Sequence, residues 1–182
     1  MIILASSSPR RKELLKEIVD EFIILVPNVD ESSNRPKNAK DIPFELAYRK
    51  AKAISKDHYN DIVIGCDTIV AFNNEVLEKP IDELDAFNML NKLNNNTHQV
   101  ISGVAIIYQD KEVRFIEESL VTFNNLTEKE ILDYIATKDP LDKAGAYGIQ
   151  NPYINLVKSL VGEYENVVGL PIKRLKEELE KL

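Results

Sequence analysis

The stretch SSSPRR at residues 6–11 combines three hydroxyls with two guanidinium groups at the expected start of a helix. Free backbone N–H groups at a helix N-terminus attract anions, and short hydroxyl side chains let a phosphate approach closely. Arginine adds planar sets of donors that match phosphate oxygens. The stretch therefore indicates a phosphate site, and a well-capped helix with solvated cations is the alternative. The sequence contains neither a Walker pattern nor a G-x-G-x-x-G fingerprint.

Asp67 lies in the segment GCDT, residues 65–68, between the apolar runs 62–64 and 69–70. A carboxylate inside an apolar strand is costly to bury unless a cation or a metal ion accompanies it. Such a group can bind a divalent metal or take a proton from water. The alternative is a bulge or turn in which Asp67 accepts hydrogen bonds from nearby backbone N–H groups.

Other charged residues stand beside breaks in the apolar pattern. Lys50 lies in a cationic helix segment, Lys79 precedes a proline, and Asp30 and Glu31 open a long polar loop. Lysine is a suitable point charge for phosphate, and carboxylates are suitable ligands for a hard metal ion. Each residue taken alone is more often a solvated surface residue.

The segment DKAGAYGIQ, residues 142–150, has two glycines among small residues. Glycine lets the backbone approach a flat ligand closely. The side chain of Gln150 has one acceptor and two donors, so it can recognise the edge of a base. An ordinary turn-rich connection is the alternative.

The elements that must position these residues follow from apolar periodicity and from turn and capping signals. Strands are expected at 2–5, 22–26, 62–70, 99–108, 112–123, 155–161 and 164–168. Helices are expected from Ser8 with Ile18 and Val19 on the apolar face, at 44–55, at 82–93 with Leu84 facing inward, at 127–137, and from Pro171. Residues 28–43 are expected to form a loop. Strands that alternate with helices early and hairpins later predict an α/β fold with a mixed central sheet.

Composition narrows the class of protein. The chain has 182 residues, 44% hydrophobic content and a net charge of −7, which disfavours non-specific binding to nucleic acid. It has no apolar run of roughly 20 residues, so no membrane span is expected. With a single cysteine, Cys66, no internal disulfide can form, and we expect a cytoplasmic protein. The two histidines are far apart in the sequence and lack zinc-ligand spacing, and Cys66 with His98 makes a poor nucleophile pair.

Four motifs occur here in the order seen in the Maf family. They are LASSSPRRKELL at 4–15, GCDTIV at 65–70 followed by EKP at 78–80, DKAGAYGIQ at 142–150 and VVGLPI at 167–172. The chain thus resembles the Maf nucleoside triphosphate pyrophosphatases, in the branch acting on dTTP and UTP. The resemblance implies one domain over residues 1–182 with two lobes around a cleft, similar to inosine triphosphate pyrophosphatases. It also implies a divalent metal, Mg²⁺ or Mn²⁺, and a homodimer.

The same resemblance assigns roles to individual residues. Asp67 takes the position of the general base, and Lys50 and Lys79 join it in the catalytic set. Glu31 and Asp67 take the metal-binding role. The expected substrate-binding residues are Ser6, Arg10, Arg11, Thr68 and Gln150, of which Arg10, Thr68 and Gln150 are associated with base specificity. The sequence departs from the family pattern at Cys66, where alanine is usual, and at Asn151-Pro152, where glycine is usual after Gln150.

These assignments predict hydrolysis between the α and β phosphorus atoms of a pyrimidine nucleoside triphosphate, which gives the monophosphate and pyrophosphate. Modified pyrimidine nucleotides are alternative substrates. A different class of function is also open, namely a nucleotide-binding regulatory protein of cell division with little catalysis. Such a protein needs the cations but has no need of a positioned base such as Asp67.

Overall fold

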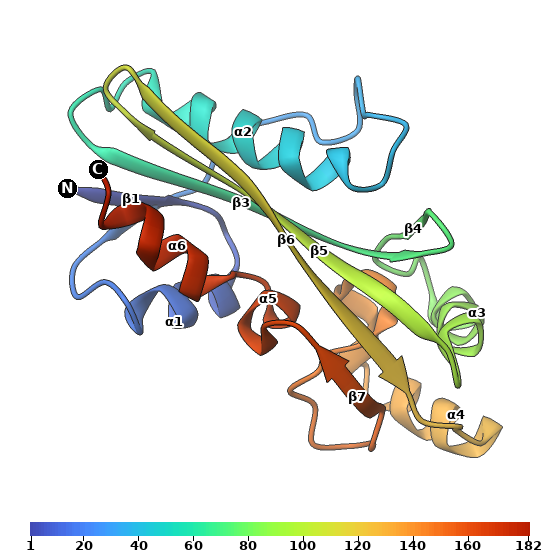
Figure 1. The fold of residues 1–182 in the computed structure, drawn as a ribbon. Helices are drawn as coiled ribbons and strands as arrows, with labels where there is room; N and C mark the ends of the chain where they lie inside the picture. The colour runs from blue at the N-terminus through green and yellow to red at the C-terminus, as the bar shows by residue number, and fades with distance from the viewer. The chain divides into compact units, whose positions relative to one another are not determined.

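The computed structural model describes all residues from 1 to 182 (Figure 1). The strands are β1 (Ile2–Ala5), β2 (Ile23–Leu25), β3 (Ile62–Phe72), β4 (Glu75–Leu77), β5 (Thr97–Tyr108), β6 (Lys111–Phe123) and β7 (Val157–Val161). The helices are α1 (Pro9–Lys16), α2 (Asp41–Ser55), α3 (Glu83–Leu93), α4 (Glu128–Ala136), α5 (Tyr164–Val168) and α6 (Ile172–Leu179), with short 3₁₀ turns η1 (Asp139–Asp142) and η2 (Ala144–Ala146). The strands form a mixed sheet in the order β2-β1-β3-β5-β6-β7, with β4 on β3, so the predicted fold class is confirmed.

The chain divides into two units, each built from separate segments. Unit 1 comprises Met1–Thr68, Ile101–Glu117 and Gly169–Leu182, and unit 2 comprises Ile69–Val100 and Glu118–Val168. The strands β3, β5 and β6 each contribute residues to both units. No helix is both long and apolar enough to cross a membrane.

In unit 1, β1 pairs in parallel with both β2 and β3. Helix α2 covers one face of these strands, and α1 and α6 cover the other (Figure 1). Two glycines let α2 approach the sheet closely. A Cβ atom on Gly65 would lie 2.2 Å from the carbonyl oxygen of Ala47, and one on Gly103 would lie 2.1 Å from that of Pro43. The position of α2 therefore depends on the absence of side chains at Gly65 and Gly103.

The core of unit 2 gathers around α3, α4 and the segment that contains η2. Its large buried side chains include Leu90, Phe123, Ile131, Tyr134 and Tyr147. Helix α4 begins at a capping box, in which Thr127 and Glu130 each accept a hydrogen bond from the other's backbone N–H. This confirms the start predicted for that helix.

Some expectations about elements are wrong. Residues 164–168 form helix α5 instead of a strand, since the chain breaks at Gly162, where φ is +114°. Helix α1 ends at Lys16, so Ile18 and Val19 lie beyond it, and α2 begins at Asp41, three residues earlier than expected. In α3 the buried face is formed by Ala86, Leu90 and Leu93, which turns Leu84 outward to 67% exposure.

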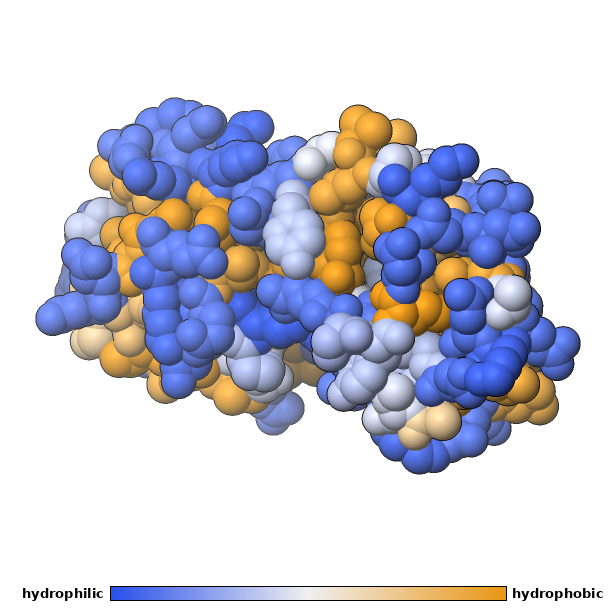
Figure 2. All heavy atoms as spheres, turned by 90° about the horizontal axis from the view of Figure 1, so that it is seen from below, coloured by the Kyte–Doolittle hydropathy of each residue, from blue (hydrophilic) through white to orange (hydrophobic).

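Figure 2 shows one face of the molecule, on which apolar residues form several patches between hydrophilic ones. Exposed large apolar side chains occur at β2 and just after it (Ile23, Ile24 and Val26), and others occur near β7 (Val161 and Tyr164). Both β2 and β7 are edge strands of the sheet. Exposed apolar groups therefore lie at both of its edges.

Candidate active site

The candidate site in unit 1 lies where β1 ends. The last pair between β1 and β3 is Ala5 with Gly65, and β3 continues for seven residues beyond that pair, to Phe72. Residues 6–8 lead from β1 into α1 at this edge. Since successive side chains of a strand point to opposite faces, Asp67 and Thr68 present their side chains on opposite faces of β3 just beyond the end of β1. Ligands of open α/β sheets bind at such carboxyl ends of strands.

The serines of the first motif are partly used by the backbone. Ser8 caps α1, since its Oγ accepts the N–H of Arg11 at 3.4 Å, and Pro9 follows at the first helical position. The Oγ of the buried Ser6 accepts the N–H of Ser8 at 3.1 Å. The capped-helix interpretation is therefore correct for Ser8. An anion site at this motif would have to be formed by neighbouring donors.

Arg11 is fixed by several contacts within unit 1. Its Nε donates to the carbonyl oxygen of Gly169 at 2.8 Å, and one Nη donates to Thr68 Oγ1 at 3.1 Å. The other Nη lies 3.5 Å from Ser6 Oγ. A guanidinium has five N–H donors, so donors remain for a ligand after these contacts. Arg11 is thus a positioned cation, whereas Arg10 is exposed on α1 and makes no hydrogen bond or ion pair.

The carbonyl oxygen of Gly169 joins three side chains of this cluster. Besides Arg11, it accepts from the hydroxyl of Thr68 at 3.2 Å and from the thiol of Cys66 at 3.4 Å. Thr68 Oγ1 also lies 2.8 Å from Ser102 Oγ. Burial raises the pKa of the Cys66 thiol, so this group stays protonated and is not a nucleophile. Ser102 and Gly169 were not singled out from the sequence, although VVGLPI contains Gly169.

On the other face of β3, two carboxylates meet one ammonium. Lys50 Nζ of α2 lies 2.7 Å from Asp67 Oδ1 and 3.1 Å from Glu31 Oε1. The side chains of Lys50 and Asp67 are only 9% and 11% exposed, whereas that of Glu31 is 52% exposed. Strand β3 runs through Asp67 without interruption, so the turn considered for this residue is not formed. The ion pair with Lys50 is what makes a buried carboxylate tolerable here.

The carboxylates also determine which metal chemistry the site fits. No group of three or more His, Cys, Asp or Glu side chains is arranged to hold a metal ion. Mg²⁺ is often bound through one or two carboxylates, with substrate phosphate and water completing its coordination. Lys50 engages only Oδ1 of Asp67, which leaves Oδ2 available. Asp67 and Glu31 therefore fit an ion that binds together with a phosphate better than they fit a protein-only metal centre.

Lys79 and Gln150 belong to unit 2. Both are exposed, and neither side chain makes a hydrogen bond or an ion pair. Their segments meet at Gly145, whose N–H donates to the carbonyl oxygen of Glu78 at 3.2 Å. Gly145 has φ of +70°, and a Cβ atom there would lie 2.9 Å from a methyl of Val70. The loop that carries Gln150 is therefore held against the segment that precedes Lys79.

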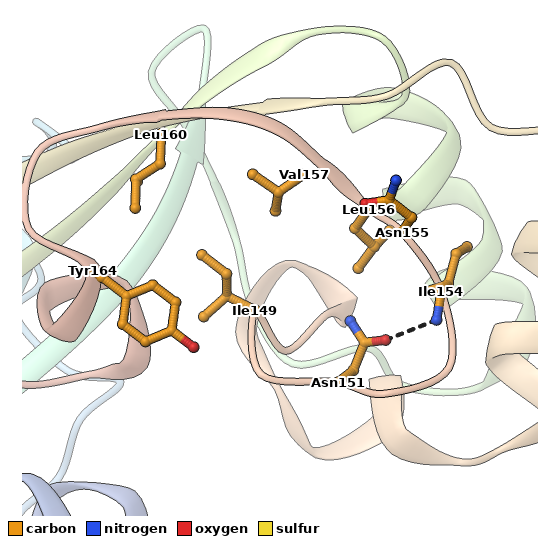
Figure 3. A pocket seen from close by; sticks show the side chains of 8 residues that line it. All are labelled: Ile149, Asn151, Ile154, Asn155, Leu156, Val157, Leu160 and Tyr164. Atoms are coloured by element: carbon orange, nitrogen blue, oxygen red, sulfur yellow. Dashed lines mark hydrogen bonds between the residues drawn. The ribbon is translucent and has the colours of Figure 1, made fainter.

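A hollow of about 360 Å³ borders this loop (Figure 3). Residues on both sides of Gln150 line it, with apolar side chains in the majority. The lining residues are Ile149, Asn151, Ile154, Asn155, Leu156, Val157, Leu160 and Tyr164. Side chains on either side of Gln150 thus turn toward an apolar space.

His98 is buried in unit 2 against the same loop. Its Nε2 lies 2.7 Å from the hydroxyl of Tyr147, and the rings of His98, Tyr147 and Phe123 meet edge to face. Burial lowers the pKa of His98 to about 4, so the imidazole is neutral at physiological pH. His98 thus supports the loop through Tyr147.

The fold defines an α/β protein of the architecture seen in solved Ham1 proteins. The Ham1 protein of Staphylococcus aureus aligns with a TM-score of 0.53 at 18% identity, covering 99% of this chain and 98% of that chain. A Ham1 protein from Coxiella burnetii aligns with a TM-score of 0.50 at 12% identity, covering 100% and 98%. At these identities the likeness concerns the fold alone.

The sequence comparisons then give the family. The family model of the Maf-like proteins matches residues 1–182, and the chain belongs to this family. A protein of Bacillus mycoides is 48% identical over 180 residues, which are 99% of this chain and 94% of that protein. A protein of Bacillus cereus is 49% identical with the same coverage. Both relatives are named dTTP/UTP pyrophosphatase.

Proposed function

We propose that this protein is a divalent-metal-dependent nucleoside triphosphate pyrophosphatase that hydrolyses dTTP and UTP to the monophosphate and pyrophosphate. The names of the 48–49% identical relatives support the substrate class. The observation that carries the proposal is the contact of Lys50 Nζ with both Asp67 and Glu31, at 2.7 and 3.1 Å. A buried carboxylate that a lysine holds just beyond the end of β1 suits proton abstraction from the attacking water.

In the proposed reaction Asp67 is the general base. Lys50 holds Oδ1 of Asp67, and Oδ2 accepts a proton from the attacking water. The water oxygen forms a bond to the α-phosphorus, and the bond from that phosphorus to the bridging oxygen of the β-phosphate breaks. Pyrophosphate leaves with the bonding electron pair, and the proton remains on Asp67 until solvent removes it.

Cationic residues stabilise the charge that develops on phosphate oxygens. Arg11 acts through the guanidinium donors that its contacts with Gly169 and Thr68 leave available. Arg10 and Lys79 supply exposed charge, Ser6 contributes a buried hydroxyl, and Gln150 recognises the base edge. Glu31 and Asp67 would hold the Mg²⁺ or Mn²⁺ ion, which neutralises phosphate charge when bound.

The proposal includes a cytoplasmic location, a homodimer, and no nucleic-acid or membrane partner. The net charge of −7 supports the absence of a nucleic-acid partner. Ile23, Ile24 and Val26, exposed at the β2 edge, support association with a second copy, since exposed apolar groups at a sheet edge are typical of interaction surfaces.

Hydrolysis of dTTP in ¹⁸O-labelled water, followed by ³¹P NMR, tests the reaction. Attack at the α-phosphorus places ¹⁸O in dTMP and leaves the pyrophosphate unlabelled. Label in pyrophosphate would place the attack on the β-phosphorus, and release of orthophosphate with dTDP would refute the proposed bond cleavage. Tight binding of dTTP without any hydrolysis would favour a regulatory nucleotide-binding protein.

A further inference from the structure

We propose that Asn151 is a positioning residue for base selectivity, which acts by fixing the turn that carries Gln150. This inference rests on the proposed function of Gln150 in recognising the base. Asn151 itself has no assigned role in substrate binding. Its importance follows from its own hydrogen bonds, all of which lie within unit 2.

The side chain of Asn151 ties together the backbone on both sides of Gln150. Its Nδ2 donates to the carbonyl oxygen of Gly148 at 2.7 Å. Its Oδ1 accepts the N–H groups of Tyr153 and Ile154, each at 3.0 Å; Figure 3 shows the contact with Ile154. One carboxamide thus closes the turn from residue 148 to residue 154, and asparagine commonly stabilises turns through such local bonds.

The other side of Gly148 is fixed by Tyr134 of α4. The N–H of Gly148 donates to the hydroxyl oxygen of Tyr134 at 3.1 Å. That hydroxyl donates in turn to Asp139 Oδ2 at 2.6 Å, and the Tyr134 side chain is almost fully buried. Both backbone groups of Gly148 are therefore held, one by a core residue and one by Asn151.

The bonds made by Asn151 and Tyr134 hold the backbone around Gln150 but do not involve its side chain. Gln150 is exposed, and its carboxamide makes no hydrogen bond within the protein. Thymine and uracil carry a carbonyl acceptor where cytosine carries an amino donor, and a glutamine carboxamide has both an acceptor and donors. A glutamine side chain can turn about its own bonds, but a backbone held in one place limits the positions that its carboxamide can reach. In this chain, we expect the selectivity for thymine and uracil to depend on how firmly Asn151 holds the backbone of Gln150.

Asn155 provides a matched control for Asn151. Both are asparagines of the same segment, and both line the hollow beside the loop (Figure 3). The side chain of Asn155 is exposed and makes no hydrogen bond, while its backbone carbonyl oxygen accepts from Asn124. Replacement of Asn155 by glycine therefore matches the loss of a side chain in the loop without removing the bonds that close the turn.

The test compares the full-length protein with Asn151→Gly, Asn151→Asp and Asn155→Gly. For each, kcat/KM and the Kd in the absence of metal are measured with dTTP and with dCTP. For Asn151→Gly, the preference for dTTP falls about tenfold, mainly through KM, since a mobile turn must be ordered on binding. Asn151→Asp keeps the acceptor for Tyr153 and Ile154 and retains part of the preference. Asn155→Gly leaves the preference for dTTP unchanged. The double variant Asn151→Gly/Gln150→Ala shows no greater loss of preference than Gln150→Ala alone.

A second measurement follows the turn without any substrate. Hydrogen exchange of the Tyr153 and Ile154 amides is faster in Asn151→Gly than in the natural protein and unchanged in Asn155→Gly. An unaltered preference for dTTP in Asn151→Gly would overturn the inference, as would an equal loss with dTTP and dCTP. Absence of hydrolysis in the natural protein would refute the proposed function instead, and the ratio of the two Kd values would still decide the role of Asn151.

Discussion

Lys50 Nζ lies 2.7 Å from Asp67 Oδ1, and neither side chain is more than 11% exposed. The two residues come from different elements, helix α2 and strand β3. A buried charge that loses its partner is strongly destabilising, so each of these residues depends on the other. Activity and stability are therefore coupled at this pair.

Replacement of Lys50 by methionine leaves the carboxylate of Asp67 buried without its nearest cation. We expect the free energy of unfolding to fall by about 3 kcal/mol, as measured by urea denaturation at pH 7. The double variant Lys50→Met/Asp67→Asn should recover most of this loss, because no charge is then stranded, and should remain inactive.

Lys52 is the control for this experiment. It lies on the same helix and pairs with Glu112 at 3.0 Å, but its side chain is 45% exposed. Lys52→Met should leave both unfolding and turnover close to those of the natural protein. Equal losses of stability and turnover in Lys50→Met and Lys52→Met would mean that the ion pair with Asp67 contributes no more than an exposed surface pair.

Substitution of Gly65 by alanine should displace α2. The new Cβ atom would lie 2.2 Å from Ala47 O and 2.7 Å from Ala51 N, both in the helix that carries Lys50. Overpacking at such a site costs about 2 kcal/mol, and we expect turnover to fall as Lys50 moves from Asp67. Urea denaturation and steady-state kinetics measure the two effects. Full stability with full turnover would show that α2 is not held by this close approach.

Stability should depend on pH through His98. Burial lowers the pKa of His98 to about 4, from the value of 6.5 expected in the unfolded chain. Between these pH values the unfolded state binds the proton and the folded state does not, so stability falls as the pH is lowered. With about 1.4 kcal/mol per pKa unit, the loss reaches about 3 kcal/mol near pH 4. The variant His98→Gln lacks this contribution. Its free energy of unfolding, measured by urea denaturation, should therefore fall less between pH 7 and pH 4.5 than that of the natural protein. Parallel pH dependence in both proteins would contradict the assignment.

Local signals in the sequence predicted local structure well. The cap at Ser8 and the capping box at Thr127 were correct because each depends on contacts between residues three positions apart. Helix α5 was missed because its valines favour a strand, while packing within unit 2 decides otherwise. There the buried side chain of Asn166 donates to Val100 O and Ser119 Oγ, residues far away in the sequence.

In the candidate site, too, residue types were predictable from the sequence, whereas contacts between residues far apart in the chain were not. The residue types of Lys50 and Arg11 indicated phosphate binding, and that of Asp67 indicated metal binding or proton abstraction. The family resemblance placed the three residues in one site. The partners that fix them could not be predicted, since Gly169 and Ser102 reach Thr68 only through the folded sheet. Asn151 departs from the family pattern, and in the structure its side chain makes three hydrogen bonds across the turn.

The most direct test of the central claim is pyrophosphate release from dTTP by the natural protein and by Asp67→Asn, each with Mg²⁺, with Mn²⁺ and with excess chelator. Asparagine keeps an oxygen for Lys50 but cannot take the proton, so we predict a folded variant with about 10³-fold lower turnover. We also predict that the chelator abolishes release by the natural protein. Near-normal, metal-supported release by Asp67→Asn would contradict the account, because the base would then have to be another group.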